Sequence, residues 1–138
     1  MVTGGTEGVL FLAARVLFGG VLAFMGLNHF GQVDAMAGYA EHKGLPAPRL
    51  AVVLSGVLLL FAGAAVVVGA FPVLAGSALA AFLLTSAVAM HDFWVVPEEQ
   101  AQDEMTQFLK NVALAGGALA LAATGTSTWA YSVGISAL

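Results

Sequence analysis

Residues 50–90 read LAVVLSGVLLLFAGAAVVVGAFPVLAGSALAAFLLTSAVAM, a stretch without a single charged side chain. It is divided by a turn signal, Gly69-Ala70-Phe71-Pro72. Glycine allows the positive φ that ends many helices, and proline fits the first turn of the next helix. A helix of about 20 apolar residues crosses a bilayer. The stretch therefore predicts two antiparallel transmembrane helices, at about 50–70 and 73–90, joined by a tight hairpin.

Two more apolar runs lie outside this hairpin, at about 9–27 and 112–130. Hydrophobic residues make up 60% of the chain and charged residues only 9%. A soluble domain carries about 25% charged residues, and a soluble helix bundle shows a polar stripe along each helix, which these runs lack. We expect an all-α, membrane four-helix bundle. It would form a single multi-pass domain over residues 1–138, embedded in the lipid bilayer of the cell membrane.

The connections between the runs differ in length. The first, residues 28–49, is long and rich in glycine and proline, but Asp34 to His42 are expected to form a short interfacial helix. The third, residues 92–111, is acidic. It begins with Pro97-Glu98-Glu99, which is typical of a helix start because acids lie near the positive end of the helix dipole. We expect an amphipathic segment that lies at the interface and continues into the fourth run.

The composition excludes several kinds of chemistry. The chain has no cysteine, so it cannot form disulfides or supply a thiolate nucleophile or thiolate metal ligand. Its net charge of −4 argues against nucleic-acid binding, which needs a basic surface. The first run contains Arg15 and is not preceded by a basic region, so we expect a retained membrane helix rather than a signal peptide.

The few basic residues suggest an orientation. Lys43, Arg49 and Lys110 belong to the side of the long connections, and Arg15 lies nearer the termini. Basic residues favour the cytoplasmic side of a membrane. The distribution therefore favours cytoplasmic long loops.

Arg15 is the most unusual residue of the first run. It lies about 9 Å from the start of the run, at the 1.5 Å rise of a helix. Two interpretations are open. The side chain can snorkel, with its stem buried and its guanidinium at the headgroups. Alternatively it faces the bundle interior and meets a backbone carbonyl, a partner subunit, or an anionic or quinone-like ligand.

Five other polar residues map to one membrane edge, from the ends of three runs: His29, His91, Asp92, Lys110 and Asn111. They can form a hydrogen-bonded plug that pins the helix ends, with Asp92 as the partner of Lys110. They can instead form a proton-handling or quinone-head site, because a histidine beside a carboxylate can titrate near neutral pH. Metal or haem ligation by the two histidines is a third alternative, but no third ligand is evident and no metal site is assigned.

The spans also contain many small residues. Pairs such as Gly116 and Ala120 have the small-xxx-small spacing that lets helix backbones approach closely. This pattern favours packing within the bundle, and a homo-oligomer interface or a slot for a flat ligand is the alternative. No nucleophile–base arrangement and no phosphate-binding loop is present, so the sequence assigns no catalytic residue.

Several motifs occur in order along the chain: Arg15-Val16-Leu17-Phe18-Gly19, Gly26-Leu27-Asn28-His29-Phe30, Lys43-Gly44-Leu45-Pro46, Gly63 and Gly69, His91-Asp92-Phe93-Trp94, Phe108-Leu109-Lys110-Asn111 and Gly116-Gly117. In this order and spacing the chain resembles the DoxX family of small four-helix membrane proteins over nearly its whole length.

The resemblance implies a membrane-embedded bundle associated with redox proteins, since the family's name comes from a terminal quinol oxidase and relatives occur in thiosulfate–quinone oxidoreductases. Many relatives carry a glutamate in the second span, where this chain has Leu58 and Leu59, so a proton relay through that helix is not expected. We interpret the protein as an accessory membrane subunit of a quinone-linked oxidoreductase system, with quinone as the possible ligand and oxidoreductase subunits as possible partners. The alternative is a structural or assembly protein without ligand or catalysis.

Overall fold

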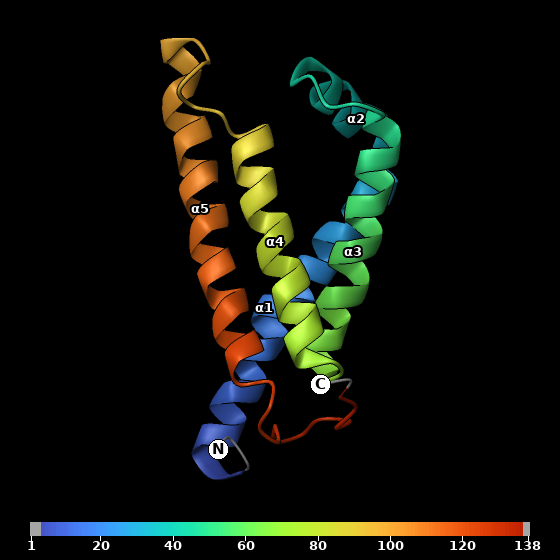
Figure 1. Ribbon diagram of the computed structural model, residues 1–138, viewed down its shortest axis with the longest axis vertical. Helices are drawn as coiled ribbons and strands as arrows, with labels where there is room; N and C mark the ends of the chain where they lie inside the picture. Colours follow the sequence, from blue (N-terminus) through green and yellow to red (C-terminus); the bar gives the residue numbers. More distant parts are fainter. Residues whose placement is uncertain (1–3, 137–138) are drawn as a thin grey trace.

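The computed structural model describes residues 4–136, and all of its regular secondary structure over that range is α-helix (Figure 1). The elements, in chain order, are α1 (Gly5–Gly31), α2 (Val33–His42), α3 (Pro48–Val68), α4 (Pro72–Met90) and α5 (Glu98–Ala123). The predicted all-α class is therefore confirmed. The start of α1 and the segment that follows α5 lie toward one end of the molecule, and α2 and the start of α5 lie at the other end (Figure 1).

Within residues 4–136, three helices are long and apolar enough to cross a membrane: α1, α3 and α4. The 21 residues of α3 extend about 31 Å at 1.5 Å per residue, which matches a hydrocarbon core of about 30 Å. The first turns of α5 are acidic and polar, so α5 does not meet the same standard. The fold is that of a helical membrane protein, and the fourth crossing stays a prediction.

The helix α5 ends at Ala123, before the end of the apolar run at 112–130. The next residues are Thr124-Gly125-Thr126-Ser127, whose small polar side chains favour turns over helix. Thr124 donates its hydroxyl to the carbonyl of Leu121 at 2.9 Å, and its own carbonyl accepts the indole N–H of Trp129 at 2.9 Å. These bonds turn the chain back toward the bundle.

The hairpin between α3 and α4 has the geometry that its sequence predicts. Gly69 has φ 73° at the end of α3, and Pro72 stands in the first turn of α4. Phe71, between them, also has a positive φ, 47°, and donates its backbone N–H to the carbonyl of Ile135 at 2.7 Å. The C-terminal segment thus forms part of this turn.

The helices associate mainly as two pairs, α1 with α3 and α4 with α5, connected through α3 and α4. The backbones of α1 and α3 touch at glycines spaced seven residues apart on both helices, Gly19 and Gly26 against Gly56 and Gly63. A Cβ on Gly19 would lie 2.5 Å from the carbonyl oxygen of Gly63. Only glycine permits so close an approach, which explains the small residues of these spans.

The pair of Gly116 and Ala120 does not take part in this packing. A Cβ on Gly116 would meet nothing within 4 Å, and Ala120 is exposed. In the α4–α5 pair the close approach is made instead by Gly76, whose Cβ would lie 2.7 Å from the carbonyl oxygen of Ala118. A homo-oligomer stays a prediction.

Large apolar side chains cover the outer faces of the membrane helices. Leu17 of α1, Phe61 of α3 and Leu74 of α4 are each more than 60% exposed. A soluble monomer rarely exposes so extensive an apolar surface. These faces are the lipid-contacting surface of the protein.

Candidate functional site

Arg15 is completely buried, with 0% of its surface exposed. Its guanidinium donates to the carbonyl oxygens of Val66 at 3.1 Å and Val67 at 2.6 Å, at the end of α3. It also donates to the carbonyls of Ala130 at 2.7 Å and Tyr131 at 3.2 Å in the C-terminal segment. The snorkelling interpretation is therefore wrong, because the guanidinium is satisfied by backbone carbonyls inside the protein.

The end of α3 explains why a cation is needed there. The last four carbonyls of a helix have no partner within the helix and carry its negative dipole end. In α3 the carbonyl of Ala65 accepts the N–H of Ala70, those of Val66 and Val67 accept Arg15, and that of Val68 accepts the N–H of Val133. All four orphan acceptors are thus paired.

Aromatic rings enclose the guanidinium of Arg15. Its Cζ lies 5.2 Å from the ring centroid of Trp129 and 5.9 Å from that of Phe11, within cation–π range. The two rings meet edge to face at 5.0 Å. Arg15 therefore holds the C-terminal segment against the helices, and it does not line the cavity described next.

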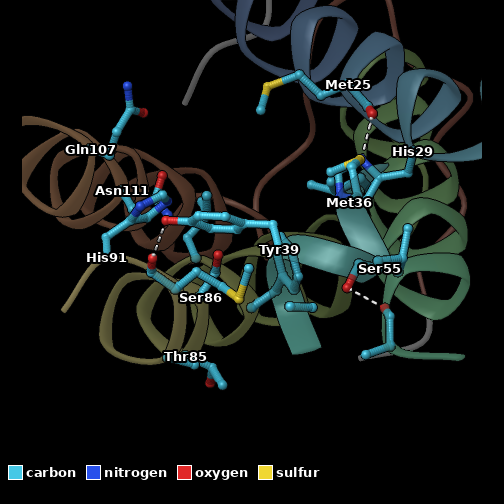
Figure 2. Close-up of a pocket in the computed structure, with 18 of the residues that line it drawn as sticks. Met25, His29, Met36, Tyr39, Ser55, Thr85, Ser86, His91, Gln107 and Asn111 are labelled. Atoms are coloured by element: carbon cyan, nitrogen blue, oxygen red, sulfur yellow. Dashed lines mark hydrogen bonds between the residues drawn. The ribbon is translucent and has the colours of Figure 1, made fainter. Parts of the chain in front are cut away.

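A cavity of about 590 Å³, open on one side, lies at the other end of the bundle and is lined by residues of α1, α2, α3, α4 and α5 (Figure 2). Its walls are mostly apolar, formed by the side chains Leu22, Met25, Met36, Leu45, Val52, Leu59, Phe82, Leu83 and Met90. Small-molecule sites in proteins span about 300–1,000 Å³ and are mostly apolar with a few placed polar groups. The cavity has this character.

Four of the six residues that the sequence singled out line this cavity: His29, His91, Lys110 and Asn111. Arg15 lies at the opposite end, and Asp92 is outside the lining. Figure 2 shows His29 on one wall, from the end of α1, and His91 and Asn111 on another, from the end of α4 and from α5. The lining between these walls is mostly apolar, and Tyr39 projects into the cavity from α2.

Each of the two histidines makes one hydrogen bond through Nδ1. In His29 this nitrogen lies 2.7 Å from the carbonyl oxygen of Met25, and in His91 it lies 2.9 Å from Oε2 of Glu104. Since a carbonyl and a carboxylate only accept, both Nδ1 atoms carry the hydrogen.

A polar network at the cavity wall joins α2 to α4 and α5. Glu104 accepts the hydroxyl of Tyr39 through Oε1 at 2.5 Å and meets His91 through Oε2. Lys43, just after α2, forms an ion pair with Asp92, and its Nζ lies 3.9 Å from Oε1 of Glu104. We call these five residues the α2 network.

The pKa values within the α2 network follow from its contacts. The hydrogen bond from Lys43 holds the pKa of Asp92 below its usual value. Burial acts to raise the pKa of Glu104, but the bonds from Tyr39 and His91 outweigh it and lower that pKa. Burial acts to lower the pKa of Lys43, but Asp92 and its neighbours raise it. Burial and Glu104 raise the pKa of Tyr39.

The expected pairing of Lys110 with Asp92 is wrong. Asp92 bonds to Lys43 from α2, and Lys110 instead donates to the side-chain amide of Gln107 one turn back on α5. Helix geometry explains this choice, because residues three apart on a helix are neighbours.

Sequence reasoning missed Tyr39 and Glu104 as site residues, although both are central to the α2 network. Glu104, Gln107 and Asn111 are separated by three and four residues, so they share one face of α5 with the residues that line the cavity. That periodicity was the available signal. Within residues 4–136, no cluster of three or more histidine and acidic side chains has a geometry suited to a metal ion.

Comparisons with known proteins agree with this architecture. The family model named DoxX matches residues 10–92, which cover most of α1 and all of α2, α3 and α4. The chain is also 30% identical over 122 residues to the inner membrane protein YphA of Escherichia coli strain K12, covering 88% of this chain and 87% of that protein. No solved structure matches the chain.

The family match and the relative span most of the chain, and three helices suited to crossing a membrane lie within the matched part. The protein is thus a multi-pass protein of the cell membrane. It belongs to the DoxX family.

Proposed function

We propose that this DoxX-family protein is an accessory membrane subunit of a quinone-linked oxidoreductase system, and that its cavity holds the head group of a quinone-type ligand. The observation that carries the proposal is the cavity of about 590 Å³ with His29 and His91 on different walls. We further propose that α5 is the fourth membrane crossing, since it packs along α4.

The ligand class follows from the distribution of polar groups. A quinone-type ring is flat and apolar, and it carries two oxygens on opposite edges. The cavity offers polar side chains on two walls, and most of its other lining side chains, such as Leu59 and Phe82, are apolar. An apolar body with polar groups at both ends is the shape that this lining complements.

The subunit role rests on the absence of an obvious reaction centre. The residues at 4–136 offer no metal-binding cluster, and the chain has no cysteine. A quinone held here would therefore exchange electrons with a partner protein that carries its own redox group. The redox association implied by the family resemblance supports this assignment.

The test begins with gentle purification from native membranes, followed by mass spectrometry of bound lipids and co-eluting proteins. We expect a stoichiometric quinone or an oxidoreductase partner. The purified protein is then titrated with a short-tailed quinone. His91→Ala and Lys110→Ala should weaken binding while the protein stays folded. His42→Ala is the matched control, because His42 is exposed and outside the cavity lining.

A specific observation favours the rival function, a structural or assembly protein. Asp92 and Glu104 of the α2 network are bonded to other residues of the chain. Such contacts are what we expect of a hydrogen-bonded plug that only pins the helix ends. If His91→Ala and Lys110→Ala lose thermal stability or fail to insert, and no quinone co-purifies with the wild type, this rival function replaces the proposal.

A further inference from the structure

The hydrogen bonds of the cavity wall determine which polar groups remain available to a ligand as donors or acceptors. A neutral imidazole has one N–H donor and one bare nitrogen acceptor. In His29 and His91 the donor is Nδ1, which is already committed to Met25 and to Glu104. In the neutral form of both side chains the remaining nitrogen, Nε2, is therefore an acceptor.

Two hydroxyl groups of the cavity lining also use their hydrogens in bonds within the protein. Tyr39 has one hydroxyl hydrogen, and the acceptors within its reach are Oε1 of Glu104 at 2.5 Å and the carbonyl of Met90 at 3.2 Å. Ser55 donates to the carbonyl of Ala51 at 2.7 Å. Each oxygen then has only lone pairs left for a ligand. Glu104 enforces this arrangement for Tyr39 and His91 together, since its carboxylate accepts from both and cannot donate.

The other polar groups of the cavity lining do not determine whether a ligand must donate or accept a hydrogen bond. The hydroxyls of Thr85 and Ser86 and the amides of Gln107 and Asn111 can donate or accept. Lys110 can only donate, but it is exposed and bonds to Gln107. The groups whose direction is fixed by partners within the protein are therefore acceptors, and they stand on both walls.

We infer that the cavity selects a hydroxyl-bearing, reduced head group, a para-dihydroxy aromatic ring, over the corresponding dicarbonyl ring. A hydroxyl donates to the bare Nε2 of a histidine, whereas a carbonyl oxygen would oppose its lone pair to that of the nitrogen. This inference rests on the proposed function, because it specifies which redox form of the quinone-type ligand is bound. Glu104 acts as a positioning residue, since it reaches the ligand only through His91 and Tyr39.

The test compares the two redox forms of one probe, a para-benzoquinone with a short alkyl tail and its hydroquinone, titrated under nitrogen at about pH 8 where imidazole is ordinarily neutral. The protein has no cysteine, so covalent addition of a thiol to the quinone does not interfere. We expect the hydroquinone to bind about tenfold more tightly, the effect of one or two hydrogen bonds.

The decisive variant is Glu104→Gln, whose amide can donate as well as accept. It should reduce the preference to about twofold or reverse it, because a donating amide lets His91 carry its hydrogen on Nε2, where it can be given to the ligand. Asp103→Asn is the matched control, since it removes the same charge from the adjacent, exposed position and should leave the preference unchanged.

A ligand-free measurement makes the test independent of how Glu104→Gln folds. Nitrogen-15 NMR of histidine-labelled protein should show His29 and His91 protonated at Nδ1, and the exposed His42 serves as the reference. Protonation at Nε2, or equal or tighter binding of the dicarbonyl form by the wild type, would overturn the inference and leave the proposed function standing. If neither form binds, the proposed function is wrong and the inference fails with it.

Discussion

Arg15 donates a hydrogen bond of 2.7 Å to the carbonyl oxygen of Ala130, which lies 115 residues further along the chain. This contact joins the first helix to the C-terminal segment, and the same guanidinium pairs the last carbonyls of α3. A single buried cation therefore holds three parts of the chain together at the end of the bundle opposite the cavity.

Replacing Arg15 with methionine should destabilise the protein without altering ligand binding in the cavity. The carbonyls of Val67 and Ala130 would lose their partner, and each buried polar group left unpaired costs about 1–3 kcal/mol. We expect a loss of at least about 2 kcal/mol in the free energy of unfolding, measured by thermal denaturation in detergent. The free energy of unfolding of Arg15→Lys should lie between that of the wild type and that of Arg15→Met, since an ammonium cannot reproduce the planar fork of donors of a guanidinium.

Equal stability of the Arg15→Met protein would contradict the structural role of this arginine. A loss of quinone binding without any loss of stability would instead place Arg15 in a ligand site, which the geometry of the cavity does not support.

The glycine contact between α1 and α3 offers a matched pair of substitutions. Gly19→Ala would put a methyl group 2.5 Å from the carbonyl of Gly63, whereas Gly20→Ala meets nothing within 4 Å. Overpacking costs about 1–3 kcal/mol, while alanine in place of an unhindered helical glycine gains up to about 1 kcal/mol. We expect Gly19→Ala to lower the melting temperature and Gly20→Ala to keep or raise it.

The opposite order of the two glycine variants would show that α1 and α3 are not packed backbone to backbone. Melting curves of both proteins in the same detergent decide the matter.

The α2 network should make the stability of the protein depend on pH under acidic conditions. The pKa values of Asp92 and Glu104 are lowered in the folded protein, so both carboxylates stabilise it above their unfolded values, near 4. This contribution is lost as the pH falls through the folded values. The raised pKa of Lys43 has its effect under alkaline conditions, because the stabilisation by the charged ammonium is lost as the pH rises above about 10.5.

Thermal denaturation between about pH 3 and pH 7 measures the acidic effect. The wild type should lose stability most steeply below about pH 4, and Asp92→Asn should flatten that decline. Asp103→Asn, on the exposed side of α5, serves as the control and should follow the wild-type profile. A wild-type profile without any acidic decline would show that these carboxylates are not paired in the folded state.

Replacing Asn111 should weaken ligand binding more than it lowers the stability of the protein. Asn111 is buried, with 8% of its surface exposed, and lines the cavity from α5. Asn111→Leu keeps the volume but removes the polar group, so we expect quinone affinity to fall several-fold with little change in melting temperature. Binding titration and thermal denaturation of the same preparation separate the two effects. Loss of stability with unchanged affinity would make Asn111 a packing residue only.

The sequence predicted much of this fold because hydropathy and turn chemistry are local properties. The apolar stretch at 50–90 with Gly69 and Pro72 defined the α3–α4 hairpin, and the histidines at helix ends pointed to one membrane edge. The partner of Asp92 could not be predicted in the same way. It depends on where α2 lies over the bundle, which is a property of tertiary packing rather than of the spacing along any helix.

The position of Arg15 shows the same limit. Its depth in the first run left snorkelling and burial equally open, because the carbonyls that accept it belong to residues 66–67 and 130–131. The sequence likewise could not show that the apolar run at 112–130 is cut short after Ala123 so that Trp129 can pack against Phe11.

The central claim is that the cavity between the helix pairs holds a quinone-type head group, and photolabelling tests it most directly. A photoreactive quinone with a short tail is added to the purified protein in native lipid, and the labelled residues are mapped by mass spectrometry. We expect label on cavity residues such as His29, Tyr39 and Met90, and its displacement by an excess of unlabelled quinone. Label spread over the lipid-facing residues Leu17 and Phe61, without displacement, would contradict the claim.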